Sequence, residues 1–304
     1  DGSFRIGAAV SGMALHDHEN FGKVWPGVLE AVNLIGSKQV QGRASAGGNL
    51  CNGSPAGDSV PAMVAAGAVV TVQGPNGRRE LKVEDVPAGP GRTNLKPGEI
   101  LVSIKLPPRP PGSSDAYLRM IPRTEMDIAV VGVGVNLTIK DGTVMAARVG
   151  LGAVAPTVLL VRQAAAALIG SRCDDAALDA CAAAARAASR PITDRRGTAD
   201  FRRQVVGVLV RRAVLVACML TMSIAALLYI IGGQYLMSLL LKWFPISGFD
   251  PNTAVIARFL ALPVLIGLVT GFGADVRFYR TVFAEEMSRD YVRTARAKGA
   301  GDAR

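Results

Sequence analysis

The longest stretch of sequence without a charged side chain sets the strongest limit on how this chain can fold. Residues 213–241 form 29 consecutive positions with no Asp, Glu, Lys or Arg. A helix needs roughly 20 mainly apolar residues to cross the hydrocarbon core of a bilayer. A second uncharged run, residues 259–274, has 16 positions and contains Pro263, so it indicates either a second span or a buried helix. We expect an all-α transmembrane hairpin here.

Basic residues flank the two uncharged runs. Arg211 and Arg212 precede the first, and a group of six from Arg277 to Lys298 follows the second. Loops rich in Lys and Arg stay on the cytoplasmic side of a membrane. We therefore expect insertion in the inner (plasma) membrane through residues 213–274, with the preceding domain and the basic tail both cytoplasmic.

Composition narrows the classes of function. Half of the residues are hydrophobic and 19% are charged, which excludes intrinsic disorder. The net charge of +10 would suit nucleic acid, but no basic stretch is interleaved with aromatic residues, so we expect no nucleic-acid partner. The four cysteines form no C-x-x-C pair, and with only two histidines they do not predict a zinc or iron–sulfur site.

The region before residue 213 has the pattern of an α+β protein. Short runs rich in Val and Ile predict strands, and Asp141-Gly142 predicts a hairpin turn between two of them. The prolines of residues 107–112 and the two serines after them predict a linker rather than a strand. The expected strands are 68–72, 100–106, 127–139 and 143–151, and an alanine-rich helix is expected from Asp174-Asp175 to about residue 189.

A glycine-rich segment is the most informative part of this region. Adjacent glycines at 47 and 48 allow several backbone N–H groups to point at one anion, and Asn49 adds a side-chain amide. This pattern suits a phosphate, although Gly-Gly-Asn is also common in ordinary loops. Asp58 stands where a short helix toward Ala66 should begin, so it is either the N-cap of that helix or an acceptor for sugar or ribityl hydroxyls.

The order of motifs along residues 1–212 resembles the FAD-binding (medium) subunit of molybdenum hydroxylases, the carbon monoxide dehydrogenase and xanthine dehydrogenase family. The resemblance is carried by Gly47-Gly48-Asn49, Ser54-Pro55, Asp58 and Pro61 and, further on, by residues 151–157 and 195–203. It implies FAD as cofactor and a role as a flavin-dependent oxidoreductase subunit. It also implies two partners, a molybdopterin-containing large subunit and an iron–sulfur small subunit.

The resemblance also implies which residues form the cofactor site. It assigns no catalytic residue. Plain core packing remains the alternative for Ile35 and Leu101, and a solvated surface charge remains the alternative for Arg119. The family's pyrophosphate loop matches Ser45, Ala46, Gly47, Gly48 and Asn49; Asp58 matches a cofactor contact; Leu101 and Ile35 fall at the isoalloxazine ring; and Arg119 falls where the family has a lysine.

The prolines after residue 106 and the start of the uncharged run at residue 213 divide the chain into three expected domains. Residues 1–108 correspond to the second subdomain of the FAD-binding domain, residues 112–212 to the flavoprotein C-terminal domain, and residues 213–304 to the membrane segment. In the family a first subdomain supplies a second pyrophosphate loop, and we expect this chain to lack it. Residues 1–212 alone should then bind FAD weakly.

The C-terminal segment resembles a different family, the permease subunits of dipeptide, oligopeptide and nickel ABC transporters. The resemblance is carried by residues 229–249, 277–281 and 288–299, and the family has further helices on both sides. It implies an ABC ATP-binding subunit and a second permease as partners, whereas the alternative for the tail is a solvated basic segment. No G-x-x-x-x-G-K-[ST] sequence is present, so we expect no ATP hydrolysis by this chain.

Three functions remain open from sequence. The first is an FAD-binding electron-transfer subunit of a molybdenum-hydroxylase-type oxidoreductase, present as a fragment fused to a permease fragment. The second is a membrane permease subunit for peptides or similar solutes. The third is a fusion of two truncated modules that performs neither task.

Overall fold

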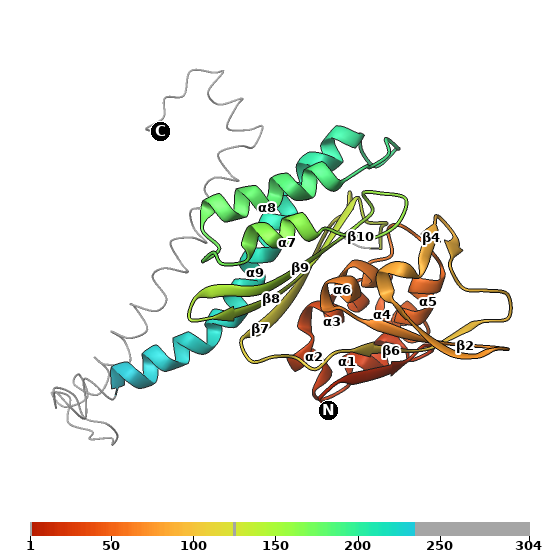
Figure 1. The fold of residues 1–304 in the computed structure, drawn as a ribbon, viewed down its shortest axis with the longest axis horizontal. Helices are drawn as coiled ribbons and strands as arrows, with labels where there is room; N and C mark the ends of the chain where they lie inside the picture. Colours follow the sequence, from red (N-terminus) through yellow and green to blue (C-terminus); the bar gives the residue numbers. More distant parts are fainter. Residues whose placement is uncertain (1, 124–125, 235–304) are drawn as a thin grey trace. The chain divides into compact units, whose positions relative to one another are not determined.

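The computed structural model describes residues 2–123 and 126–234, with side chains described as far as residue 219. The chain divides into two compact units, Asp1–Thr221 and Met222–Arg304. The first unit contains two antiparallel sheets of four strands each, together with a two-stranded ribbon. Figure 1 shows these sheets and the helices that cover them.

The first sheet has the strand order β1-β6-β2-β3. Buried side chains of β6 and β2, including Ile104 and Val70, form a core with the aromatic residues Phe21 and Trp25. The strands are β1 (Phe4–Gly7), β2 (Val69–Gly74), β3 (Gly77–Lys82) and β6 (Ile100–Leu106), and the ribbon pairs β4 (Pro87–Gly89) with β5 (Arg92–Thr93) after the 3-10 turn Val83–Asp85.

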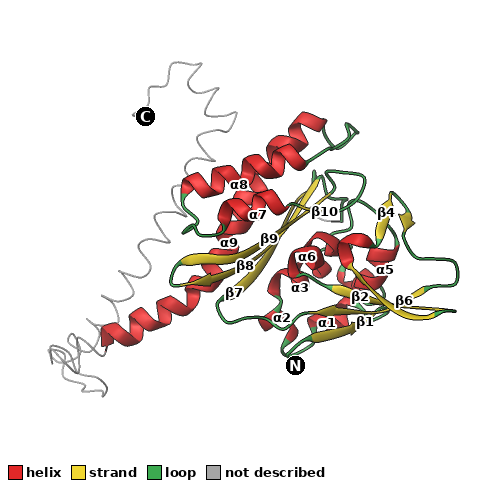
Figure 2. Ribbon diagram, viewed as in Figure 1, coloured by secondary structure: helices red, strands yellow, loops and turns green. Residues whose placement is uncertain are grey.

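Six short helices accompany this sheet (Figure 2). Every residue of the last one, α6, is buried, because α6 packs against helices on one side and against the second sheet on the other. A helix that is apolar all round belongs in the interior of a protein. The helices are α1 (Gly12–His16), α2 (Phe21–Val24), α3 (Pro26–Asn33), α4 (Lys38–Gln41), α5 (Ala46–Cys51) and α6 (Ser59–Ala66).

The second sheet has the order β10-β9-β8-β7 and is covered by three further helices. Alternate valines of β8, at 131, 133 and 135, are buried in one core with the apolar residues of these helices. The elements are β7 (Ser113–Met120), β8 (Val131–Lys140), β9 (Thr143–Gly152), β10 (Leu159–Leu160), α7 (Arg162–Leu168), α8 (Asp175–Ala188) and α9 (Ala199–Gln234).

Glycines on the opposite face of this sheet let α6 approach closely. A Cβ added at Gly134 would lie 2.5 Å from the carbonyl oxygen of Pro61, and one at Gly150 would lie 2.4 Å from the same atom. No real side chain tolerates such distances, so the α6 backbone can pack here only because these positions are glycine. The alternating Val and Gly residues of β8 therefore serve both faces of the sheet.

Most of the elements expected from sequence are present. Strand β6 coincides with the expected range, the hairpin turns at Asp141-Gly142, and α8 begins after Asp174, whose side chain accepts a hydrogen bond from the Ala177 N–H. The predicted strand 127–139 is shorter at its start, because β8 begins at Val131. The expectation that Ser113 and Ser114 belong to a linker was wrong, since both lie in β7.

The transmembrane hairpin is not shown. Within residues 2–123 and 126–234, as far as they are described, no helix is long and apolar enough to cross a bilayer. Residues 235–304, which include the second uncharged run and the basic tail, lie outside the described residues.

The contact between α6 and the second sheet leads to a stability prediction. The Gly134→Ala variant should lower the free energy of unfolding by about 1–3 kcal/mol, because its new methyl group would collide with the Pro61 and Ala62 backbone. Gly42→Ala is the control, because Gly42 has ordinary helical angles and its Cβ would meet backbone oxygen only at 3.4 Å. Urea unfolding compares the two, and equal stabilities would contradict the close packing.

Candidate functional site

The loop predicted to bind phosphate forms the beginning of α5. Ser45 is the N-cap of this helix, and its Oγ accepts a hydrogen bond of 3.0 Å from the Gly48 N–H. A Cβ at Gly47 would lie 2.4 Å from the carbonyl oxygen of Ala8, so Gly47 allows the loop to pack on the segment that follows β1. Ser45 also pairs with Ser11 in an isolated antiparallel bridge, which fixes the position of the loop.

Gly48 and Asn49 give this loop an open face. Gly48 is exposed, and apart from its chain neighbours and the backbone of its own helix, a Cβ added there would meet only Ser45 Oγ within 4 Å, at 3.1 Å. The Oδ1 atom of Asn49 accepts a hydrogen bond of 2.7 Å from Ser59 Oγ, and its amide nitrogen has no hydrogen bond to any described residue. Exposed backbone beside an available amide donor is the arrangement that a phosphate needs.

Asp58 stands at the N-cap position of α6, as expected, but its side chain does not cap the helix. Its backbone is already helical, and its carboxylate makes no capping hydrogen bond. Instead Oδ1 accepts a hydrogen bond of 2.7 Å from the Tyr117 hydroxyl, and Oδ2 is 2.7 Å from the Arg119 guanidinium. Asp58 is only 8% exposed, so it joins α6 to β7 through a buried ion pair.

Arg119 is likewise not a solvated surface charge. Its side chain is 8% exposed, and besides the Asp58 pair it donates a hydrogen bond of 3.1 Å to the carbonyl oxygen of Leu34. Ile35, the next residue, is half-buried just after α3. The structure thus brings Asp58 and Arg119 together beside Leu34, the residue before Ile35, and Ser59, next to Asp58, is hydrogen-bonded to Asn49.

Leu101 is buried in the first core. It is 9% exposed on β6 and belongs to the same cluster as Ala46 and Leu50 of α5. Core packing and a place beside a bound ring are both consistent with this position, so its contact with a cofactor stays a prediction. Among the described residues, the apolar side chains of Ile35 and Leu101 make no polar contact.

Sequence reasoning missed Asp115 and Tyr117, which lie on the same face of β7 as Arg119; only Arg119 was named, from the family resemblance. Asp115, Tyr117 and Arg119 are two residues apart, and alternate residues of a strand share a face. Asp115 accepts a hydrogen bond of 3.0 Å from the Val28 N–H at the start of α3 and pairs with Arg109 at 2.8 Å. Polar residues with a spacing of two were the available signal, but the expected linker concealed it.

Burial shifts the protonation equilibria in this cluster. Desolvation raises the pKa of Asp58 above its usual value, against the hydrogen bond from Tyr117 and the charge of Arg119. Desolvation and the neighbouring Asp58 raise the pKa of Tyr117 well above 10, so its hydroxyl stays a donor. Desolvation also raises the pKa of Asp115, opposed by Arg109. These groups hold their partners through hydrogen bonds.

Two family models match the first unit over most of its length. Residues 1–109 match the FAD binding domain in molybdopterin dehydrogenase, and residues 116–217 match the CO dehydrogenase flavoprotein C-terminal domain. A third family, the binding-protein-dependent transport system inner membrane component, matches residues 202–304. The second and third matches overlap on α9.

Individual relatives agree with the first two matches. The carbon monoxide dehydrogenase medium chain of Afipia carboxidovorans is 35% identical over 209 residues, which are 69% of this chain and 72% of the relative. The xanthine dehydrogenase FAD-binding subunit of Escherichia coli O157:H7 is 30% identical over 54% of this chain and 56% of its own length.

Solved structures extend the similarity to the fold. Carbon monoxide dehydrogenase from Hydrogenophaga pseudoflava superimposes with a TM-score of 0.70 at 33% identity, covering 72% of this chain and 76% of that one. Quinoline 2-oxidoreductase from Pseudomonas putida 86 shares the fold, with a TM-score of 0.68 at 24% identity. The first unit is thus an FAD-binding flavoprotein module. The chain belongs to the family of FAD-binding medium subunits of molybdenum hydroxylases, which includes the carbon monoxide dehydrogenase medium chains.

The ion pair at the site leads to a prediction about stability and pH. Arg119→Met should lower the free energy of unfolding by about 3–5 kcal/mol at neutral pH, because it leaves the Asp58 carboxylate buried without a cation. The pKa of Asp58 in the folded variant would then lie further above its unfolded value near 3.8. Protonation of a carboxyl with a raised folded pKa stabilises the folded state, so the deficit should shrink as pH falls through that pKa.

A surface ion pair provides the control for this variant. Arg123 lies 3.2 Å from Asp127, and its side chain is 72% exposed, so Arg123→Met should change stability by about 1 kcal/mol or less. Urea unfolding at several pH values measures both variants. A deficit for Arg119→Met that matches the control at every pH would contradict the buried ion pair.

Proposed function

We propose that the first unit is the flavin electron-transfer subunit of a molybdenum-hydroxylase-type oxidoreductase. FAD, the cofactor of the family, supplies the redox chemistry when it is bound. The observation that supports this role most directly is the open face at Gly48 beside the available amide of Asn49. The relatives' names support the same chemistry, since they include carbon monoxide and xanthine dehydrogenase subunits.

The residues of the loop would hold the cofactor by its pyrophosphate. Ser45 fixes the first turn of α5 through its hydrogen bond with Gly48, and Gly47 lets that turn lie against Ala8. Ala46 is buried under the turn. The amide of Asn49 is held by Ser59, so it is preorganised to donate to a phosphate oxygen.

Asp58 and Arg119 would act at the other end of the site. Their mutual contact and the Tyr117 hydroxyl fix both side chains, and Arg119 also holds the backbone at Leu34, next to Ile35. Carboxylate oxygens carry more than one lone pair, so Asp58 retains acceptor capacity for a flavin group. We place Ile35 and Leu101 as the apolar contacts of the ring.

The partners follow from the same assignment. We propose a molybdopterin-containing large subunit that oxidises the substrate and an iron–sulfur small subunit that relays electrons to the flavin. Electron relay between chains requires the three to assemble as one complex, and the relatives called medium chains and FAD-binding subunits support such an assembly.

Gly48 provides the test of the cofactor site. Gly48→Asp places a carboxylate on the face where the pyrophosphate would lie, so FAD affinity should fall at least tenfold, equivalent to about 1.4 kcal/mol. Gly42→Asp is the control, because it adds the same charge to a neighbouring exposed turn. Titration of apoprotein with FAD by flavin fluorescence measures both. Equal affinities would exclude this loop as the pyrophosphate site.

The match of residues 202–304 to a transport family supports a second candidate function for the C-terminal segment. We propose that the hairpin expected over residues 213–274 enters the inner membrane beyond Cys218, since residues as far as Cys218 pack in the second core. An ABC ATP-binding subunit and a second permease would be its partners. Both flanks of the hairpin carry arginines, so the flavoprotein unit and the basic tail would face the cytoplasm.

Cysteine labelling in intact cells tests this topology. A cysteine introduced at Ser247 should react with a membrane-impermeant maleimide, and one at Ser288 should not, because the arginine-rich flanks resist transfer across the bilayer. The experiment starts from a cysteine-free variant. Labelling only at Ser288 would reverse the orientation, and labelling at both positions would mean that residues 259–274 do not span.

A further inference from the structure

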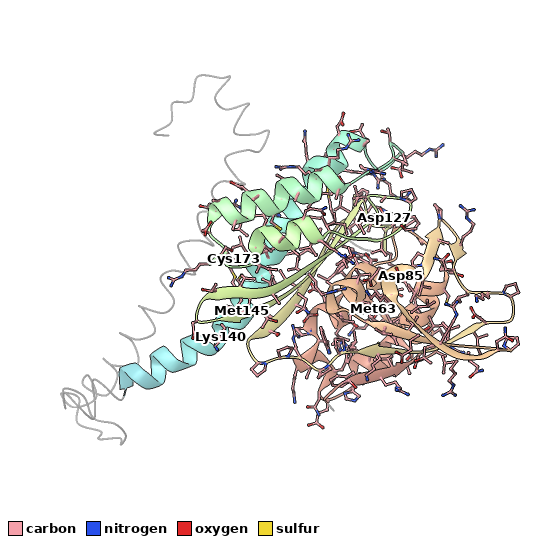
Figure 3. The ribbon with its side chains drawn as sticks, in the orientation of Figure 1. Met63, Asp85, Asp127, Lys140, Met145 and Cys173 are labelled. Atoms are coloured by element: carbon pink, nitrogen blue, oxygen red, sulfur yellow. The ribbon has the colours of Figure 1, made fainter. Side chains whose placement is uncertain are left out.

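Three of the four cysteines gather where the loop before α8 meets α8 and α9. Cys173 lies in that loop (Figure 3), Cys181 is on α8 and Cys218 is on α9, and all three belong to or pack against the second core. Cys173 Sγ and Cys218 Sγ are 3.2 Å apart, although they are 45 residues apart in sequence. The fourth cysteine, Cys51, is exposed on α5 and belongs to the other half of the unit.

The separation of the two sulfur atoms is close to that of a covalent bond. A disulfide is about 2.05 Å long, so its formation would require a movement of roughly 1 Å. Cys173 lies in a loop with a positive φ of 54°, and its N–H donates to Ser171 Oγ, so the local chain rather than a helix would adjust. The movement needed is therefore small.

The two thiols differ in access and in acidity. Cys173 is half-buried, whereas Cys218 is 8% exposed, so a small oxidant in solution reaches Cys173 first. The hydrogen bond donated by the Cys218 thiol lowers the pKa of Cys173, while the same contact and burial raise the pKa of Cys218. The more acidic thiol at the more accessible sulfur and the less acidic thiol behind it suit an attacking and a resolving cysteine.

We propose that Cys173 and Cys218 form a reversible redox pair that hydrogen peroxide closes to a disulfide. The Cys173 thiolate attacks one peroxide oxygen, the O–O bond breaks, and the hydroxide released takes up a proton to leave as water. The Cys218 sulfur then attacks the sulfenic sulfur of Cys173, and the S–O bond breaks. The Cys218 proton leaves with that hydroxide as a second water, so two electrons have passed from the two sulfurs to peroxide.

The position of this pair gives the disulfide a structural consequence. The flavoprotein C-terminal match ends at residue 217 and the compact unit ends at Thr221, so Cys218 stands at the end of the flavoprotein module on α9. The transport-family match already includes this part of the helix. A covalent bond to the loop before α8 would hold the part of α9 around Cys218 on the second sheet's core, and a thiol such as glutathione would release it by exchange.

The test treats the purified full-length chain with hydrogen peroxide and counts its thiols. Oxidation should reduce the reactive thiols of the denatured chain from four to two. Non-reducing peptide mapping should find one linked pair of peptides, those containing Cys173 and Cys218, and dithiothreitol should separate them. The oxidised form should also melt at a higher temperature, because the bond restrains the unfolded chain.

Single substitutions separate this pair from its neighbours. Cys173→Ser and Cys218→Ser should each abolish the linked peptide and the rise in melting temperature, while Cys51→Ser, at the exposed cysteine, should change neither. Far-UV circular dichroism before oxidation confirms that each variant is folded. A linked peptide that contains Cys181 or Cys51, or over-oxidation of Cys173 to sulfinic acid without any link, would overturn the proposal.

Discussion

The first unit has two halves, one built around each four-stranded sheet, and they pack together through one face of β7. The rest of the unit depends on this contact. Asp115 receives the N–H of Val28 and holds Arg109, while Tyr117 and Arg119 bind the carboxylate of Asp58. Arg109 also lies over the ring of Trp25, 4.6 Å from its centroid. Taking these charges out of water is costly unless they find partners. Here Asp115 contacts Arg109 and the Val28 N–H, and Asp58 contacts Tyr117 and Arg119. A displaced β7 would leave several buried charges unpaired at once.

The same docking determines where the site residues lie. Helix α6 packs against β8 and β9 only because Gly134 and Gly150 leave room for the backbone at Pro61. This close approach brings Asp58, three residues before Pro61, within hydrogen-bond distance of Tyr117 and Arg119. Ser59 then holds Asn49, and Arg119 holds Leu34, so packing and polar contacts connect the phosphate loop to Ile35. The site is thus a consequence of how the two halves pack.

These details also explain which features of the fold and site could be predicted from the sequence. Local signals were sufficient for β6, the Asp141-Gly142 turn and the start of α8 at Asp174-Asp175, because each depends on a few neighbouring residues. The family assignment of residues 1–212 was confirmed, since an ordered series of motifs is more specific than any one of them. The roles of Asp58 and Arg119 depend on residues about 60 positions away, and no local pattern contains that information. Strand β7 was missed because prolines precede it and because the polar residues on its buried face are paired across the interface.

Helix α9 connects the flavoprotein module to the segment that resembles a permease. Its residues up to Cys218 pack in the second core, and the described side chains of this part include the buried Val206, Val210, Val214 and Ala217. A helix with one apolar face suits a globular core, whereas a membrane span is apolar all round. Arg211 still pairs with Asp175 and Asp179 of α8, so the polar face of α9 is also used by the flavoprotein module. The first residues of the uncharged run, from Ala213 to Cys218, therefore pack in the core of this module. Apolar sequence alone could not distinguish that use from a membrane span.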